Sequence, residues 1–273
     1  MKYKLLAIDL DGTTIDDNGN VPQINIEAIR KASEKGVFVV PTTGRTLHEI
    51  DPAILEEKSI EYFIFSNGSA IYRRGEGVIY KDTFDQNLVK ELVDMLGEYE
   101  TMIELYADGH PYADSDKLSK QSYEYFNIDP IYHSVLDDTR VGVESIKDFS
   151  RGDINVEMFN VFFKNMDERS ECMERLKKID SIDITSSMEN NIEILKKNCN
   201  KGTAVTKLID ILGIDKSQAI AVGDSGNDIT SLKAVGLPVA VENACPALKE
   251  VAEHIVCSNN DGAIACILYR YII

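Results

Sequence analysis

The sequence is short of positive charge. Its 273 residues carry 29 Lys and Arg against 46 Asp and Glu, which gives a formal net charge of −17 at pH 7. A surface of this charge repels the phosphate backbone of nucleic acids, and no basic stripe along the chain would overcome the repulsion. The sequence therefore predicts no nucleic-acid partner. A small phosphate ester is also an anion, so a site for one would need a cation or local positive groups.

Long apolar runs and spaced cysteine pairs are also missing. No segment is long enough to span a membrane, and the short apolar run near the N-terminus ends at Asp9, too early for a signal peptide. The cysteines are odd in number and lack metal-ligand spacing, so we expect buried thiols in a reducing cytoplasm. They are Cys172, Cys199, Cys245, Cys257 and Cys266. These absences predict a cytoplasmic protein without a membrane partner, and no protein partner can be read from the sequence.

Both ends of the chain alternate short apolar runs, expected as strands, with segments of helical spacing. Strands are expected over Leu5–Leu10, Val37–Val40, Tyr62–Phe65, Ala219–Val222, Leu237–Val241 and Ile255–Cys257, and a hairpin over Ala70–Thr83. Helices are expected over Ile24–Lys35, Leu47–Lys58, Ala204–Leu212, Ile229–Val235, Pro246–Ala252 and Ala263–Tyr271. This alternation predicts an α/β protein with a parallel, doubly wound sheet.

The middle of the chain has a different pattern. Several of its expected strands alternate polar and apolar residues, which suits a half-exposed antiparallel sheet. The strands are expected over Met102–Tyr106, Val156–Phe163, Ile182–Ser186 and Ile192–Leu195, and helices over Leu88–Leu96 and Glu168–Leu176. We therefore predict a core made of residues 1–83 and 199–273, interrupted by an inserted α/β domain of residues 84–198.

Acidic residues follow two of the expected parallel strands, at the sheet edge where ligands bind. Asp9 and Asp11 are two residues apart, and Gly12 allows a sharp turn after them. Bringing them together with Asp224 and Asp228 would crowd four carboxylates, which cannot all stay ionised without a counter-ion. A hard divalent cation resolves the repulsion, and Mg²⁺ suits carboxylates that share it with a substrate phosphate.

Other polar residues near this edge could bind a phosphate. Thr43 and the Gly44 amide follow the second strand, where a helix N-terminus can bind an anion. Lys201 begins a helix and supplies a compact positive charge, and Asn227 can donate an amide hydrogen bond. Each residue alone would be read as a turn, a helix cap or solvated surface. Together they predict phosphoryl transfer, which depends mainly on positioning and charge stabilisation.

Four segments in this order resemble the motifs of the haloacid dehalogenase superfamily. They are Asp9–Thr13, Thr43–Arg45, Lys201–Ala204 and Gly223–Asp228, with further similarity at Val239–Ala244 and Ser258–Gly262. The large insertion between the second and third motifs is similar to that of the Cof-type phosphatases of subclass IIB. The resemblance covers nearly the whole chain and implies a Rossmann-like core with a mobile α/β cap domain. Thr14, Leu232 and Val241–Glu242 depart from the family pattern without removing a catalytic group.

The resemblance also implies a role for each residue of the site. Asp9 would attack phosphorus and form an aspartyl-phosphate, and Asp11 would protonate the leaving alcohol and then activate water. Mg²⁺ would be held by Asp9, Asp224 and the backbone carbonyl of Asp11, with Asp228 supporting the metal through water or by orienting Lys201. The phosphate would be bound by the Leu10 backbone, Thr43, Gly44, Lys201 and Asn227.

These residues lead to a hypothesis of magnesium-dependent hydrolysis of a small organic phosphate monoester, such as a sugar phosphate or a related metabolite. A phosphomutase using the same intermediate is an alternative. So is a phosphate-binding regulator without turnover, although Asp11 argues against a long-lived phosphorylated state. Arg45 would contact substrate or pair with an acidic neighbour. Possible specificity contacts, with ordinary surface or core roles as the alternative, are Tyr106, His110, Tyr112 and Arg140.

Overall fold

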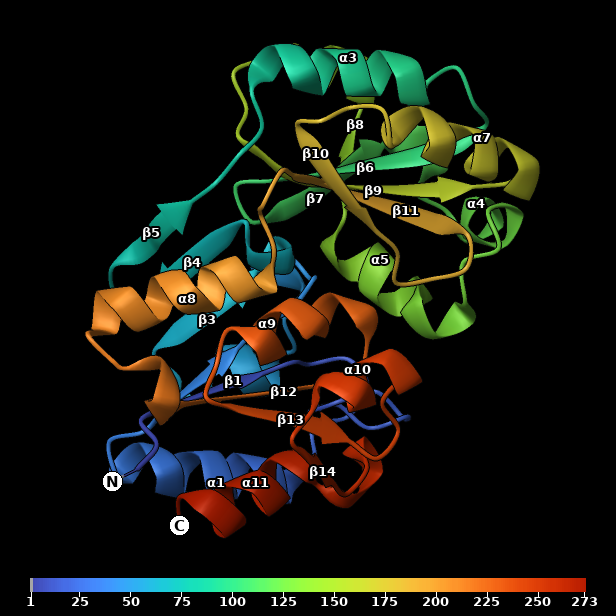
Figure 1. Cartoon of the computed structure of the whole chain (residues 1–273). Coiled ribbons are helices and arrows are strands. Elements are labelled where there is room, and N and C mark those ends of the chain that lie inside the picture. The colour runs from blue at the N-terminus through green and yellow to red at the C-terminus, as the bar shows by residue number, and fades with distance from the viewer. Residues whose placement is uncertain (1) are drawn as a thin grey trace. The chain divides into compact units, whose positions relative to one another are not determined.

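The computed structural model describes residues 2–273, which divide into two compact units (Figure 1). The first unit comprises the chain up to Arg45 together with Ile50–Tyr80 and Asn200–Ile273. The second unit comprises Thr46–Glu49 and Lys81–Cys199. The expected insertion, residues 84–198, lies inside the second unit. The short segment Thr46–Glu49 joins that unit from an earlier part of the chain.

A five-stranded parallel sheet forms the centre of the first unit, in the strand order β14-β13-β12-β1-β2. Its strands are β1 (Leu5–Ile8), β2 (Phe38–Pro41), β12 (Ala219–Gly223), β13 (Leu237–Val241) and β14 (His254–Val256). All residues of β1 and β12 are buried, as expected of strands that are covered on both faces. The predicted parallel, doubly wound sheet is confirmed.

Helices cover both faces of this sheet. Figure 1 shows α1 and α11 beside each other on one face and α9 and α10 on the other. The helices of this unit are α1 (Gln23–Glu34), α2 (Pro52–Leu55), α8 (Lys201–Leu212), α9 (Ile229–Lys233), α10 (Pro246–Val251) and α11 (Ala263–Tyr271). Helix α1 buries Ile26, Ile29 and Ala32, whose spacing of three places them on one face.

A smaller sheet of β3 (Tyr62–Phe65), β4 (Ala70–Arg73) and β5 (Gly77–Lys81) completes the first unit and contains the expected hairpin. Strands β3 and β4 are antiparallel. Strand β3 also runs beside the end of β2, where Thr42 and Ile64 form a parallel bridge. The turn after β3 therefore lies next to the segment that follows β2.

The single helix expected over Leu47–Lys58 is wrong. The structure has a short 3-10 helix, η1 (Leu47–Glu49), and then the one-turn helix α2, which begins at Pro52. The residue before a proline is disfavoured in the helical region, and Asp51 has extended backbone angles, φ −51° and ψ 132°. Asp51 instead caps α2 by accepting a hydrogen bond from the Ala53 amide at 2.7 Å.

The second unit contains a six-stranded sheet in the order β10-β11-β9-β6-β7-β8, antiparallel except for the β7–β8 pair. Its strands are β6 (Thr101–Ala107), β7 (His110–Asp114), β8 (Val141–Val143), β9 (Val156–Phe163), β10 (Ile182–Thr185) and β11 (Asn191–Lys196). Its helices are α3 (Gln86–Leu96), α4 (Lys120–Tyr125), α5 (His133–Thr139), α6 (Ile146–Phe149) and α7 (Met166–Leu176). The expected strands and helices are present, whereas β7, β8 and α4 to α6 are additional.

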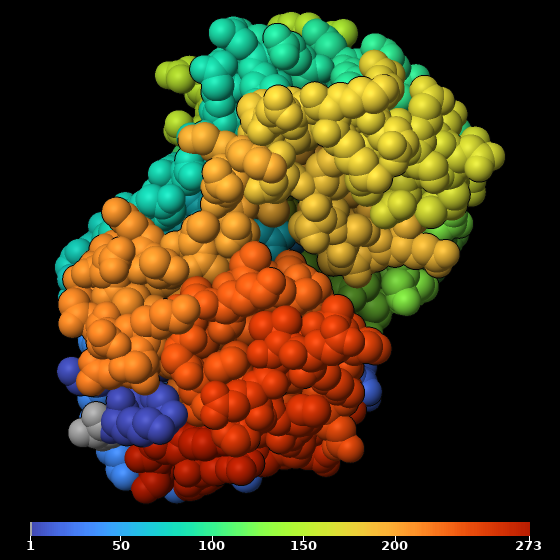
Figure 2. Space-filling view, in the orientation of Figure 1, coloured from blue at the N-terminus to red at the C-terminus, as the bar shows by residue number. Residues whose placement is uncertain are grey.

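The two faces of this sheet pack differently. One face and helices α3, α6 and α7 share a large apolar core that includes Leu92, Ile103 and Phe159. The opposite face carries a smaller apolar cluster that includes Tyr123 and Phe162. In the space-filling view of Figure 2, residues Lys81–Cys199 of this unit run from teal through green to yellow-orange.

A buried ion cluster joins distant segments of the second unit. Arg140, which follows α5, donates from Nε and Nη2 to the two carboxylate oxygens of Glu104 at 2.7 and 3.0 Å. Its Nη1 pairs with Glu49, and the side chains of all three residues are at most 4% exposed. Burial alone would lower the pKa of Arg140, but the Glu104 and Glu49 carboxylates outweigh it and raise the pKa. Arg140, one of the possible substrate contacts, thus fastens the segment containing Glu49 to this unit.

The cysteines differ in part from expectation. Cys257 and Cys266 form a disulfide, so their interpretation as thiols is wrong. Cys257 follows β14 and Cys266 lies in α11, so the turn between these elements brings the two together. Cys172 and Cys199 are buried free thiols, and Cys245 is a half-buried one. Within residues 2–273, no helix has the length and apolar character needed to cross a membrane.

Replacing Arg140 with Met should destabilise the second unit by about 3–5 kcal/mol, because Glu49 and Glu104 would remain buried without their cation. Urea denaturation followed by circular dichroism measures the free energy of unfolding. The matched control is Arg175→Met in the same unit, because Arg175 pairs with Glu98 at 2.7 Å with side chains 36% and 60% exposed. This control should lose less than about 1 kcal/mol. Equal losses in the two variants would contradict the structural role of Arg140.

Candidate active site

Three neighbouring strands bring polar residues to one edge of the core sheet. Strands β12, β1 and β2 are parallel, so their carboxyl ends meet there. Asp9 follows β1, Thr43 follows β2 and Asp224 follows β12. The ladder of backbone hydrogen bonds extends to this edge, since the Asp9 amide donates to the Val222 carbonyl at 3.1 Å. The nucleophile candidate is therefore held by the sheet itself.

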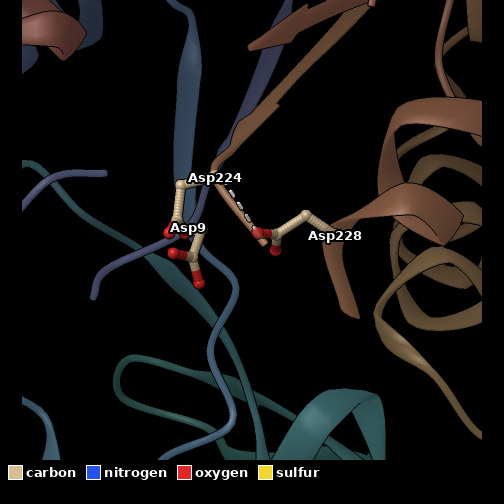
Figure 3. Close-up of side chains that lie close together, drawn as sticks. All are labelled: Asp9, Asp224 and Asp228. Carbon is tan, nitrogen blue, oxygen red and sulfur yellow. Dashed lines mark hydrogen bonds between the residues drawn. The ribbon is translucent and has the colours of Figure 1, made fainter. Parts of the chain in front are cut away.

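Three carboxylates gather at this edge. Asp9, Asp224 and Asp228 offer oxygens that all lie within 4.8 Å of one another. Figure 3 shows Asp9 and Asp224 next to each other, with Asp228 reaching toward them from its own segment. Burial raises the pKa of Asp9 well above its usual value, and the Asp228 carboxylate raises it further, against the opposing effect of Lys201. Burial and Asp228 likewise raise the pKa of Asp224 to about 6.

The Lys201 ammonium lies between two of these carboxylates. Its Nζ is 2.6 Å from Asp9 Oδ1 and 2.7 Å from Asp228 Oδ1, and its side chain is only 1% exposed. Burial alone would lower the pKa of Lys201, but the Asp228 and Asp9 carboxylates outweigh it and raise the pKa. One ammonium cannot neutralise three carboxylates. The donor set, made of oxygens with excess negative charge, therefore fits a hard divalent cation.

Local sequence explains why Lys201 stands there. Asn200 caps α8, because its side chain accepts from the Thr203 amide at 3.0 Å and the Thr203 hydroxyl accepts from the Asn200 amide at 3.1 Å. Lys201 is thus the first helical residue. Gly202 allows α8 to approach α9, since a Cβ atom there would lie 2.2 Å from the Thr230 carbonyl oxygen. This close packing places the ammonium beside Asp228.

Asp228 is positioned by the turn that follows β12. This turn contains the 3-10 helix η6 (Gly226–Asp228), and Asp228 Oδ2 accepts from the backbone amides of Asp224 and Ser225, both at 3.1 Å. Its Oδ1 accepts from Lys201. Both oxygens of Asp228 therefore have protein partners, and one of these is the Lys201 ammonium that Asp228 was expected to orient.

Asp11 is engaged differently from the other three. Arg45 donates to both of its carboxylate oxygens, from Nε at 3.0 Å and from Nη2 at 2.7 Å. The Asp11 side chain is 47% exposed, and its carboxylate is not in the group that lies within 4.8 Å. Of the two roles considered for Arg45, the structure shows the pairing with an acidic neighbour.

The expected phosphate-binding residues lie along the same edge. Thr43 is buried, and its hydroxyl accepts from the Arg45 amide at 3.1 Å across Gly44. Asn227 Oδ1 accepts from Lys201 Nζ at 3.4 Å. The Leu10 carbonyl accepts amides from the three residues Thr13–Ile15, which closes the turn after β1. The structure thus brings the segments of all five candidates to one end of the sheet.

Several residues beside the site were not singled out by the sequence. The Thr14 hydroxyl donates to the Asp9 carbonyl at 2.5 Å, and the Thr13 hydroxyl donates to Asp224 Oδ1 at 3.4 Å. Asn243 Nδ2 donates to the Gly12 carbonyl at 2.7 Å. Thr13 and Asn243 lie in two of the segments that resemble the family. That resemblance could have identified them as residues near the site. Thr14 instead occupied a position that departs from the family.

The comparison with known proteins agrees with this geometry. The sequence pattern of the haloacid dehalogenase-like hydrolases matches residues 6–268, so the chain belongs to this family. The 5-amino-6-(5-phospho-D-ribitylamino)uracil phosphatase YwtE of Bacillus subtilis is 31% identical over 287 residues, covering 96% of each chain. A second phosphatase of that name, YcsE of the same species, is 27% identical and covers 99% of this chain and 96% of its own length.

A solved structure shares the fold as well. A haloacid dehalogenase-like hydrolase from B. subtilis matches with a TM-score of 0.83 at 24% identity, covering 99% of this chain and 100% of the other. The predicted resemblance to the haloacid dehalogenase superfamily is confirmed, and so is the predicted α/β core with an inserted domain. The prediction of an enzyme of the phosphoric monoester hydrolase class is also confirmed.

Gly12 offers a test of the carboxylate geometry. Its φ is +71°, and a Cβ atom there would lie 2.7 Å from Asp224 Oδ2. Gly12→Ala should therefore displace Asp224, lower phosphate release at least about tenfold and weaken the binding of any divalent cation at the carboxylates. Gly19→Ala is the matched control, because Gly19 has φ +79° and no atom within 4 Å of such a Cβ. Both variants should lose about 1–2 kcal/mol of stability to backbone strain. Phosphate release and divalent-cation binding that stay unchanged in Gly12→Ala would argue against Asp224 as a ligand.

Proposed function

We propose that this chain is a magnesium-dependent phosphatase that hydrolyses a small organic phosphate monoester through an aspartyl-phosphate on Asp9. The observation that carries the proposal is the group of Asp9, Asp224 and Asp228 around the buried Lys201 ammonium, at the carboxyl edge of a parallel sheet. Membership of a hydrolase family, together with relatives that are named phosphatases, supports it.

In the proposed first step, the Asp9 carboxylate attacks phosphorus while the bond from phosphorus to the leaving alcohol oxygen breaks. Lys201 holds Asp9 Oδ1 at 2.6 Å, which fixes the nucleophile, and its ammonium stabilises negative charge on the transferring phosphoryl group. The neighbouring amides and Asn227 bind the phosphoryl oxygens. Mg²⁺, when bound by Asp9, Asp224 and the Asp11 backbone carbonyl, would offset the repulsion between the carboxylate and the phosphate anion.

Asp11 carries the proposed proton transfers. It gives a proton to the leaving alcohol oxygen and then takes one from the water that hydrolyses the acyl phosphate. In the structure both of its oxygens are paired with Arg45. The proposed role therefore requires this ion pair to loosen during each cycle, and its partial exposure allows Asp11 to change partner.

The proposal also assigns a role to each unit of the chain, a cellular location and a class of substrates. The first unit would be the catalytic core, and the second unit, Lys81–Cys199 with Thr46–Glu49, would act as a mobile cap that determines specificity. A cytoplasmic location stays a prediction. Two relatives named for a phosphorylated ribitylamino compound favour sugar and sugar-alcohol phosphates as the first substrates to try.

Asp9→Asn should lower the rate of phosphate release by about 10⁴-fold or more, because it removes the nucleophile. Asp11→Asn should lower it by about 10²–10⁴-fold, because it removes acid–base catalysis. With p-nitrophenyl phosphate, whose leaving group needs no proton, Asp11→Asn should accumulate phosphorylated Asp9, which acid quenching and mass spectrometry detect.

The same experiment includes its own control, since Asp9→Asn should accumulate no phosphorylated protein. Full activity in Asp9→Asn would sink the nucleophile assignment. A phosphorylated Asp9 that persists for hours in the wild-type protein would favour the regulator that does not turn over.

A panel of phosphorylated sugars, sugar alcohols and related metabolites should yield free phosphate in the presence of Mg²⁺. Removing the metal with a chelator should abolish turnover, and adding Mg²⁺ back should restore it. Without a counter-ion, the carboxylates of the site would repel the phosphate of the substrate. Mass spectrometry of each reaction separates the alternatives. An isomeric sugar phosphate without free phosphate would indicate a phosphomutase, and undiminished turnover in chelator would exclude the metal.

A further inference from the structure

The turn that follows β3 has an unusual backbone. Ser66, Asn67 and Gly68 have φ values of 49°, 52° and 98°, so three successive residues lie in the left-handed region. Positive φ is uncommon for residues other than glycine, and such strain costs about 1–3 kcal/mol per residue. Ser66 and Asn67 are also buried. A strained conformation of this kind persists only where the surrounding structure holds it.

Backbone hydrogen bonds tie this turn to the segment after β2. The Ser66 amide donates to the Arg45 carbonyl at 2.8 Å, and the Asn67 amide donates to the Thr43 carbonyl at 3.0 Å. In return, the Thr43 amide donates to the Ile64 carbonyl at 3.0 Å. The turn and the proposed phosphate-binding segment thus fix one another.

The same turn also packs against the start of α8. A Cβ atom on Gly68 would lie 2.3 Å from the Asn200 carbonyl oxygen and 2.9 Å from the Lys201 amide nitrogen. Only a glycine permits this approach, which places the turn against the residue that carries the buried ammonium.

The Asn67 side chain makes the third connection. Its Oδ1 accepts a hydrogen bond from Asn227 Nδ2 at 3.1 Å. Its Nδ2 would lie 3.2 Å from a Cβ atom placed on Gly44. Asn227 in turn accepts from Lys201 through Oδ1 at 3.4 Å. One buried amide therefore lies between two of the proposed phosphate-binding segments and is linked through Asn227 to Lys201.

We infer that Asn67 is a positioning residue that orients the Asn227 amide for phosphate binding, an inference that rests on the proposed function. A primary amide has two N–H donors. Asn67 takes one of those on Asn227, which fixes the plane of the amide and leaves the second for a phosphoryl oxygen. Asparagine suits the position twice, because it tolerates the left-handed backbone and its side-chain oxygen is the acceptor.

The test uses Asn67→Gly, which keeps the positive φ and removes only the amide. Competitive inhibition by inorganic phosphate measures ground-state binding, and the inhibition constant should rise about tenfold, as expected for loss of a hydrogen-bonded donor. Thermal melting followed by circular dichroism should stay close to that of the wild type. Asn127→Gly is the matched control, since Asn127 has φ 55° in the second unit, and it should leave the constant unchanged.

A double-mutant cycle with Asn227→Ala separates positioning from general damage. If Asn67 acts through Asn227, the double variant should bind phosphate no more weakly than Asn227→Ala alone, whereas a merely structural role predicts additive losses. Additive losses in the double variant would overturn this inference alone. So would normal inhibition by phosphate in Asn67→Gly if Asn227→Ala binds phosphate more weakly. Normal inhibition in Asn227→Ala would overturn it together with the proposed phosphate site. Should Asn67→Gly prove unstable, the same cycle is measured in the cold, where inorganic phosphate bound to the folded state also stabilises it, and the same criteria decide.

Discussion

The site depends on the Lys201 ammonium, which is buried between the carboxylates of Asp9 and Asp228. Buried charges are costly unless they are paired, so each of these three groups requires the other two. The capping of α8, the missing side chain of Gly202 and the turn that holds Asp228 all serve to make this contact possible. One ammonium leaves excess negative charge among the three carboxylates, and a hard divalent cation fits this donor set.

Much of the core could be predicted because its signals are local. Buried parallel strands read as short apolar runs, and α1 has apolar residues at helical spacing. The candidate residues followed from these strands, since parallel strands bring their carboxyl ends together. The single helix expected after Arg45 is interrupted before Pro52, because a proline disfavours helical backbone angles in the residue before it.

Other features depend on contacts between distant parts of the chain and could not be predicted in this way. Arg140 and Glu49 are far apart in sequence, and nothing in either segment indicates that they pair. The Cys257–Cys266 disulfide depends on how the turn after β14 meets α11. The sequence does not single out Asn67, because its backbone angle and its bond to Asn227 appear only in three dimensions.

The membership of Thr46–Glu49 in the second unit sets a condition for transplanting the inserted domain. A recombination that replaced only Lys81–Cys199 would leave Glu49 behind without Arg140, a buried acid separated from its base. A transferable module would have to carry both stretches of sequence. The smaller stretch directly follows Arg45, which pairs with Asp11. Replacing it would therefore also change the residues that adjoin Arg45 in the sequence.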